Sequence, residues 1–319
     1  MKNALRIGTR DSQLAVWQAT LVKDQLHKQG IASELVFIKS EGDIDLVTPL
    51  YELGVQGIFT QTLDAALLNN RIDIAVHSMK DVPTQMAKGI VQAAVLPRAS
   101  YKDILVYKGD EKKLLEALEW NDNSKLKIQN SKLTIATSSI RRKAQWLHRY
   151  PNHTIENLRG NVNTRLRKVA ESNWNGAIFA AAGLERINLR PENSIELDWM
   201  LPAPAQGAIM IVCREEDHSS KEACSPLNDD ATALCTKIER DFLRALLGGC
   251  ATPISALAQW KEGNVIFRGN ILSVDGKEKI DIELDAPSLQ SDELGNKAAQ
   301  QLLQKGADKI VNAIRNAGA

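Results

Sequence analysis

The residues from Asp73 to Thr84, with the sequence DIAVHSMKDVPT, join an apolar run to a crowded set of polar groups. An apolar run typical of a buried strand ends at His77 and Ser78, and a proline soon afterwards prevents a helix. Between them stand Lys80 and Asp81, at the end of a strand where ligands often bind. Among cationic groups Asp81 stays ionised, which suits it to stabilise a cationic intermediate. An ordinary polar loop with a Lys–Asp pair is the alternative.

Arginines recur where helices are expected to begin. The positions are Arg10, Arg141, Arg142, Arg159, Arg165 and Arg167. A helix N-terminus presents free N–H groups and a partial positive charge, and guanidinium groups bind carboxylate or phosphate through two hydrogen bonds. A single arginine of this kind is usually a solvated surface residue. Because arginine opposes the dipole at a helix N-terminus, the recurrence predicts a ligand with several carboxylates or phosphates.

Cys250 lies in the sequence LGGCATPI, directly after two glycines that end a long predicted helix. An isolated cysteine is more often a small buried residue than a nucleophile. The flexible neighbours nevertheless make Cys250 the thiol that we expect to be most accessible. The four cysteines form no CxxC pair and have no histidine at zinc-ligand spacing, so reduced thiols and no metal are expected.

Two α/β units are expected to position these groups. β-branched runs alternate with helical patterns from residue 5 onwards, and the rhythm restarts at LTIATSS, after a connecting region that contains DILVY. The segments IGTRDS and IATSSI open the two units alike, each before a helix with a tryptophan. Two such lobes would enclose a cleft at the carboxyl ends of their strands.

The last third of the chain has a different pattern. A helix is predicted over residues 232–247, followed by the strand-like segments SALAQW, NVIFRGNILS and KIDIELDA and a C-terminal helix. This order predicts a smaller α+β unit. The preceding segment LPAPAQGAIMIVC contains a buried-type strand, and we expect it to return to the sheet of the first lobe.

Composition and charge narrow the class of protein. The 319 residues are 44% hydrophobic and 25% charged, which is typical of a globular protein with two or three domains. A formal net charge of +1 gives no global attraction to nucleic acid or to anionic lipid. Charges at Arg6, Arg10 and Asp11 interrupt any signal-peptide core, and the apolar runs are strand-sized. A cytoplasmic protein that binds neither membrane nor nucleic acid is expected.

The chain resembles the porphobilinogen deaminase (hydroxymethylbilane synthase) family over nearly its whole length. The segments that carry the resemblance are IGTRDSQLAVWQA, ALLNNRIDIAVHSMKDVPT, ATSSIRRKAQ, NLRGNVNTRLRKV, AAGLERI, LPAPAQGA and LGGCATPI. The resemblance implies two periplasmic-binding-protein-like α/β domains with mixed, mostly parallel sheets and a smaller α+β C-terminal domain. The expected domains are residues 1–101 with 205–226, residues 102–204, and residues 227–319.

The resemblance also implies an activity. Such a transferase of heme and tetrapyrrole biosynthesis condenses four porphobilinogen molecules head to tail, releases ammonia and hydrolyses off hydroxymethylbilane. The growing chain is built on a dipyrromethane cofactor that is bonded to the cysteine of the GGC motif, here Cys250. The family is usually monomeric, and its product is expected to pass to uroporphyrinogen III synthase.

The matched motifs assign roles residue by residue. Each pyrrole carries an acetate and a propionate, so the growing chain needs many cationic partners. The catalytic positions are Asp81, Arg10 and Lys80. The cofactor-binding positions are Cys250, Asp81, Lys80, Ser139, Arg141 and Arg142. The substrate-binding positions are Arg10, Gln18, Arg159, Arg165 and Arg186.

The chain departs from the family between Gly42 and Asp64, which is a lid in the family. The residues that replace the usual aspartate and lysines there are Val47, Glu52, Gln56 and Gln61. No lid lysine is therefore assigned. Two alternatives to the deaminase stay open: a solute-binding protein for a polycarboxylate, and an enzyme that acts on another anionic substrate through Asp81 and Lys80.

Overall fold

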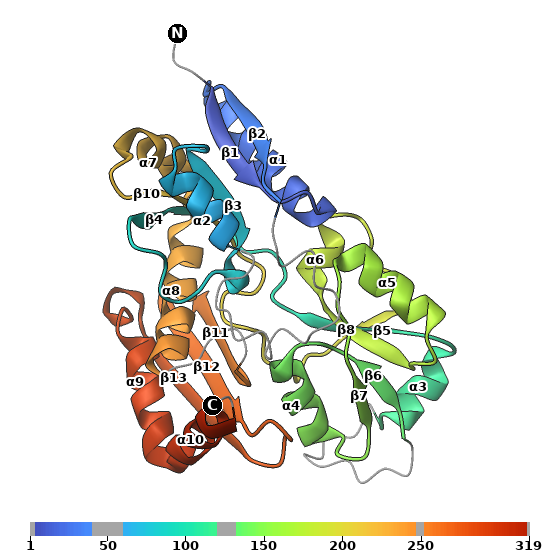
Figure 1. Cartoon of the computed structure of the whole chain (residues 1–319). Coiled ribbons are helices and arrows are strands. Elements are labelled where there is room, and N and C mark those ends of the chain that lie inside the picture. Colours follow the sequence, from blue (N-terminus) through green and yellow to red (C-terminus); the bar gives the residue numbers. More distant parts are fainter. Residues whose placement is uncertain (1–3, 40–59, 120–131, 247–251, 318–319) are drawn as a thin grey trace.

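The computed structural model describes residues 4–39, 60–119, 132–246 and 252–317. These residues form three units, each with its own β-sheet. Figure 1 shows the two lobes and the C-terminal unit grouped around a common centre, with helix α8 (Asp230–Ala245) running from the first lobe to the C-terminal unit. The arrangement confirms the predicted fold class of two α/β lobes and a smaller α+β unit.

The first lobe is built on a five-stranded mixed sheet. Its strands, in spatial order, are β2 (Ser33–Phe37), β1 (Leu5–Thr9), β3 (Ile74–Ser78), β10 (Ile209–Arg214) and β4 (Ile90–Val95). β1 pairs with β2 and β3 in parallel, whereas β10 runs antiparallel between β3 and β4. The helices are α1 (Gln13–Lys28), α2 (Gln61–Leu68) and α7 (His218–Cys224). The predicted return of LPAPAQGAIMIVC to this sheet is confirmed, since it supplies β10.

The second lobe repeats this plan. Its strands, in spatial order, are β7 (Thr154–Glu156), β6 (Thr134–Ala136), β8 (Gly176–Ala180), β5 (Asp103–Tyr107) and β9 (Ser194–Glu196). β6 pairs with β7 and β8 in parallel, and β5 runs antiparallel between β8 and β9. The helices are α3 (Glu111–Ala117), α4 (Ile140–Arg149), α5 (Val162–Glu171) and α6 (Ala181–Glu185). The expected likeness of IGTRDS and IATSSI is confirmed, because β1–α1 and β6–α4 occupy equivalent places.

The sequence pattern placed the segment DILVY in a connecting region, and this prediction is wrong. The segment forms β5, whose five residues are all buried in the second sheet. Separate apolar clusters cover the two faces of each lobe's sheet. A strand that is buried on both faces reads as a continuous apolar run, which by itself does not reveal its neighbours.

The chain crosses between the lobes twice, in residues 96–102 and 197–208, just before β5 and β10 respectively. The two crossing segments touch at Gly207, whose carbonyl accepts a hydrogen bond from the Ala99 N–H at 3.1 Å. Gly207 has φ +89°, and a Cβ there would lie 2.7 Å from the Ser100 carbonyl oxygen. Only glycine therefore permits this close approach.

The C-terminal unit packs helices on one face of an antiparallel sheet. Its strands are β11 (Ile254–Lys261), β12 (Asn264–Leu272) and β13 (Lys279–Pro287). Besides α8, its helices are α9 (Leu294–Leu302) and α10 (Asp308–Ala317). Phe242 of α8 and Phe267 of β12 meet in the core, with ring centroids 5.0 Å apart.

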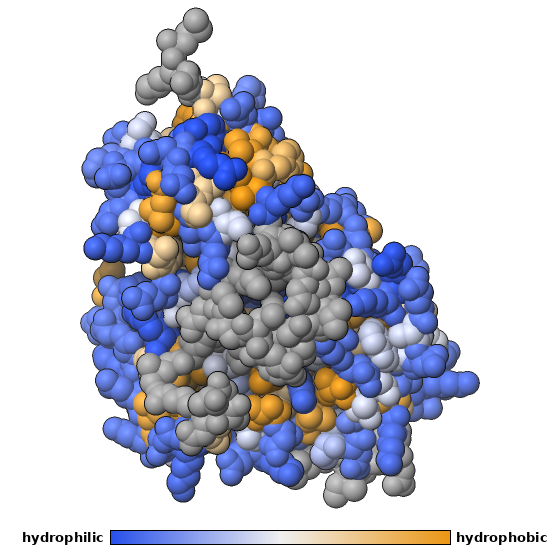
Figure 2. All heavy atoms as spheres, viewed as in Figure 1, coloured by the Kyte–Doolittle hydropathy of each residue, from blue (hydrophilic) through white to orange (hydrophobic). Residues whose placement is uncertain are grey.

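The molecular surface is mainly hydrophilic on the face that Figure 2 shows, with hydrophobic residues in small patches. None of the helices in the described residues combines the length and the apolar character that a bilayer span requires.

Candidate active site

A cavity of about 310 Å³ lies where the three units meet. On the first lobe it is bounded by the ends of β1 and β3, and on the second lobe by the end of β8 and the starts of α4 and α5. The C-terminal unit contributes Leu243, Thr252 and Ile254. The predicted cleft at the carboxyl ends of parallel strands is therefore present.

Most of the predicted site residues line this cavity. They are Arg10, Lys80, Asp81, Ser139, Arg141, Arg142, Arg159 and Arg165. They come from segments that are far apart in the sequence, and the shared plan of the two lobes brings them together. The cavity wall is consequently rich in cations.

Lys80 and Asp81 follow β3 on a short 3₁₀ turn over Met79–Asp81. Met79 is buried, and Arg240 of α8 donates hydrogen bonds to the Val82 and Pro83 carbonyls at 2.8 and 2.6 Å. The turn is thus held from both sides. Burial lowers the pKa of Lys80 to about 8, although the neighbouring carboxylate of Asp81 opposes this change.

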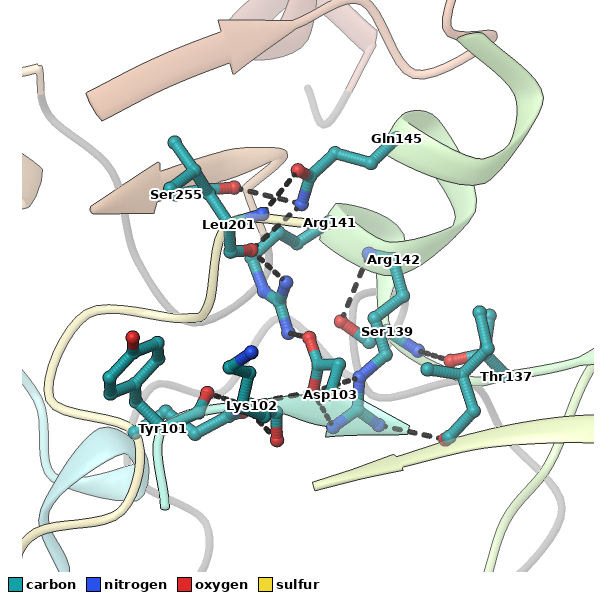
Figure 3. A network of polar contacts seen from close by, with 12 residues as sticks. Tyr101, Lys102, Asp103, Thr137, Ser139, Arg141, Arg142, Gln145, Leu201 and Ser255 are labelled. Atoms are coloured by element: carbon teal, nitrogen blue, oxygen red, sulfur yellow. Dashed lines mark hydrogen bonds and ion pairs between the residues drawn. The ribbon is translucent and has the colours of Figure 1, made fainter. Parts of the chain in front are cut away.

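Arg141 and Arg142, in the first turn of α4, share a buried carboxylate that the sequence analysis did not identify. Asp103, the first residue of β5, accepts from Nη2 of Arg141 at 2.7 Å and from Nη2 and Nε of Arg142 at 2.8 and 3.1 Å (Figure 3). Burial alone would raise the pKa of Asp103, but the two guanidinium charges hold it well below its ordinary value. The only sequence signal was a carboxylate at the head of an apolar strand.

Arg141 and Arg142 differ in the guanidinium donors that remain available to a ligand. Arg142 uses its remaining Nη1 on the Ile178 carbonyl at 3.0 Å, while its backbone N–H donates to the N-cap Ser139. Arg141 donates through Nη1 to the Leu201 carbonyl at 2.6 Å. Its Nε is buried and has no hydrogen-bond partner among the described residues. Arg141 therefore keeps one donor for a further acceptor.

Arg159 and Arg165 bring more positive charge at the start of α5. Asn161 caps this helix by accepting from the Thr164 N–H at 2.9 Å. Burial, together with the charges of Arg142 and Arg159, lowers the pKa of Arg165 to about 10, although the carboxylate of Asp81 opposes this change. Within the described part of the chain, the buried Nε of Arg165 has no acceptor. Such crowded, desolvated cations are stabilised by an anionic ligand.

Two predicted substrate-binding residues lie behind the cavity wall. Gln18 is buried and donates to Oγ of Ser78 at 2.9 Å. Arg186 donates to the Gly207 carbonyl at 2.7 Å, and its guanidinium carbon lies 5.7 Å from the ring centroid of Trp17. A role for Gln18 and Arg186 in substrate binding stays a prediction.

Cys250 lies outside the described residues, as do Val47, Glu52 and Gln56 of the expected lid. Gln61, the fourth residue of that region, is the first residue of α2. Thr252, the described residue that follows Cys250 most closely, lines the cavity.

The cavity residues fit an anionic organic cofactor. Carboxylates are suitable acceptors for the buried Nε groups of Arg141 and Arg165, and a cavity of about 310 Å³ is at the lower end of sizes for small-molecule sites. No group of three histidine, cysteine or acidic side chains able to hold a metal ion occurs in residues 4–39, 60–119, 132–246 and 252–317. An organic polyanion is thus the ligand that this wall favours.

Comparison with known proteins agrees with this chemistry. Residues 5–222 match the family model "Porphobilinogen deaminase, dipyromethane cofactor binding domain", and residues 233–304 match "Porphobilinogen deaminase, C-terminal domain". A porphobilinogen deaminase of Syntrophotalea carbinolica is 40% identical over 98% of this chain and 96% of that protein. One of Chlorobium phaeobacteroides is 38% identical over 99% of both chains.

Among solved structures, an ancestral cationic amino acid solute binding protein has a TM-score of 0.43 and 15% identity, covering 71% of this chain and 88% of that one. This similarity is too low to carry an argument. The two family models and the full-length relatives are decisive, and they show that the chain belongs to the porphobilinogen deaminase family.

Proposed function

We propose that this protein is a porphobilinogen deaminase, which condenses four porphobilinogen molecules with release of ammonia and then releases hydroxymethylbilane. The observation that carries the proposal is that Asp81 and Lys80 line the same cavity as cationic side chains from the other lobe. Porphobilinogen carries two carboxylates and one aminomethyl group, so it needs cations to hold it and one carboxylate where positive charge develops.

The guanidinium groups bind the acetate and propionate side chains in this proposal. Arg141 and Arg165, with their buried Nε donors, are the residues best placed to bind carboxylates, and Arg10 and Arg159 extend the cationic wall. Asp81 stabilises the positive charge that appears as the carbon–nitrogen bond of the substrate breaks. Lys80 and Ser139 complete the polar lining.

The bound dipyrromethane supplies a primer whose free terminal pyrrole carbon accepts each incoming unit. We propose Cys250 as its attachment point. The cysteines in the described residues, Cys213, Cys224 and Cys235, are buried. Burial raises the pKa of Cys224 to about 12 and that of Cys235 to about 11, which makes them poor nucleophiles. The position of Thr252 on the cavity wall supports attachment nearby.

The proposal also includes the limits of the three domains. They are residues 1–101 with 205–226, residues 102–204, and residues 227–319, and the presence of three separate sheets supports them. Hydroxymethylbilane is a reactive linear tetrapyrrole that closes spontaneously, so an enzyme that directs ring closure, a uroporphyrinogen III synthase, is the expected recipient. Gln18 and Arg186 are proposed to support substrate binding from behind the wall.

The deciding experiment compares intact masses of the purified wild type, Cys250→Ser and the control Cys235→Ser. Wild type and control are expected to carry the additional mass of two pyrrole units, which Cys250→Ser lacks. Incubation with porphobilinogen should release ammonia and yield uroporphyrinogen I from wild type. An unmodified mass in all three proteins without ammonia release would instead support a polycarboxylate-binding protein. A wild type that carries the additional mass but releases no ammonia from porphobilinogen would indicate another anionic substrate.

A further inference from the structure

Gln206 connects the two lobes at the cavity wall. It lies in the second crossing segment, is 1% exposed and belongs to the cavity lining. Its Nε2 donates to the Tyr101 carbonyl at 2.8 Å and to Oδ1 of Asp103 at 2.9 Å. Its Oε1 accepts from Nζ of Lys80 at 3.4 Å. The amide nitrogen faces only acceptors, so the amide oxygen is directed at Lys80.

The main chain of Gln206 is held as firmly as its side chain. Nε of Arg98 donates to the Gln206 carbonyl at 2.8 Å, and Arg98 is itself paired with the buried Glu239. The amide therefore has little freedom to turn or shift. Because the amide is fixed, it holds Lys80 and Asp103 at a set distance from each other.

The neighbours on the two sides belong to different parts of the proposed site. Lys80 comes from the first lobe, next to Asp81. Asp103 comes from the second lobe and holds the guanidinium groups of Arg141 and Arg142. Gln206 thus hydrogen-bonds both the Lys80 ammonium and the Asp103 carboxylate.

We propose that Gln206 is a positioning residue, which fixes the ammonium of Lys80 relative to the Asp103–Arg141–Arg142 cluster and so sets the spacing between the two halves of the site. The inference rests on the proposed function, because it concerns the same cavity. Gln206 does not react with the substrate; it acts through Lys80 and Asp103.

The charges around Lys80 give the sign of the effect. Burial lowers its pKa to about 8, the carboxylates of Asp81 and Asp103 raise it, and the guanidinium groups of Arg142 and Arg141 lower it. The Gln206 oxygen favours the protonated form by accepting from it. Loss of this acceptor should therefore lower the pKa of Lys80 further.

The test is Gln206→Met in the cofactor-loaded enzyme, because methionine is similar in volume and lacks the amide. The rate of Lys80 acetylation is measured against pH by peptide mass spectrometry. The midpoint is expected to fall by roughly one pH unit relative to wild type. The kcat for porphobilinogen is expected to fall by roughly ten- to a hundredfold, with a smaller change in KM.

Gln145→Met is the matched control. Gln145 is also buried, and its amide atoms pair with Leu201 and Ser255 at 2.9 to 3.1 Å (Figure 3 shows its position). We expect Gln145→Met to lower Tm about as much as Gln206→Met does, while the pH midpoint of Lys80 acetylation stays as in wild type. A Lys80 midpoint that moves in both variants, or in neither, overturns the proposal.

Gln206→Asn carries the test should Gln206→Met not fold. Asparagine keeps a polar amide but is one methylene shorter, so it cannot reach both the Lys80 ammonium and the Asp103 carboxylate. The Lys80 midpoint is again expected to fall, and an unchanged midpoint refutes the positioning role. The acetylation readout needs no turnover, so a wild type that releases no ammonia rejects the proposed function alone.

Discussion

Arg98 and Glu239 form a buried ion pair in which Nη1 and Nη2 meet Oε1 and Oε2 at 2.6 and 3.1 Å. Glu239 is fully buried and also accepts from the backbone N–H groups of Ala205 and Ala258, at 2.6 and 2.8 Å. One carboxylate therefore joins both crossing segments to α8 and β11. The place of the C-terminal unit beside the cavity depends on this contact.

Arg98→Ala is expected to lower the free energy of unfolding by about 3–5 kcal/mol, because it leaves the Glu239 carboxylate buried without its cation. Denaturant unfolding followed by circular dichroism measures this change. The control is Arg167→Ala, which removes an exposed pair with Glu171 at 4.0 Å and should change the value by less than about 0.5 kcal/mol. Equal losses of unfolding free energy in Arg98→Ala and Arg167→Ala would contradict the stabilising role of the Arg98–Glu239 pair.

Asp81→Asn should reduce the rate of ammonia release by about 100-fold or more, because the amide has nearly the same shape but cannot offset developing positive charge. Far-UV circular dichroism and Tm are expected to stay as in wild type. Asp292→Asn, at a carboxylate that is 77% exposed, should leave the rate unchanged. Wild-type turnover in Asp81→Asn would remove this residue from the mechanism.

Arg165 and Arg167 lie two residues apart on α5 but face different surroundings. Arg165 lines the cavity with a buried Nε, whereas Arg167 is 68% exposed. Arg165→Leu is expected to raise KM for porphobilinogen by roughly 10- to 100-fold through loss of a charged hydrogen bond. Steady-state kinetics of Arg165→Leu and Arg167→Leu decide the point, and comparable KM values in the two variants would argue against Arg165.

His153 should make the protein less stable in mild acid. Burial lowers its pKa from 6.5 to about 4, while its Nδ1 accepts from Nε1–H of Trp146 at 3.2 Å. The unfolded chain binds this proton below about pH 6.5 and the folded chain only near pH 4, so stability present above pH 6.5 is lost as pH falls through this window. The contribution is about 3 kcal/mol.

Urea unfolding between pH 7 and 4 tests this dependence. His153→Gln keeps an acceptor for Trp146 without a titrating ring. Its free energy of unfolding should therefore change less with pH than that of wild type. The exposed His218→Gln should leave the curve unchanged. Burial also lowers the pKa of His77 to about 4, so part of the slope persists in His153→Gln. Parallel curves for His153→Gln and wild type would show that the slope arises elsewhere.

The sequence by itself determined the elements and the kinds of chemistry. Strand-to-helix turns with arginine and the polar end of the Asp73–Thr84 segment are local patterns, and local patterns follow from backbone geometry and burial. The same holds for the return of LPAPAQGAIMIVC to the first sheet, which its apolar run after two prolines indicated. These features lie on the cavity wall or beside it as expected.

Only the tertiary structure decided which charges meet. Asp103 lies in none of the segments that carry the resemblance, and Gln206, although it lies within LPAPAQGA, had no role that its sequence position could indicate. They became part of the site when β5 and β10 entered the sheets next to β8 and β3. The pairing of strands distant in sequence places one negative charge against Arg141 and Arg142, and the strength of a buried charge depends on such neighbours.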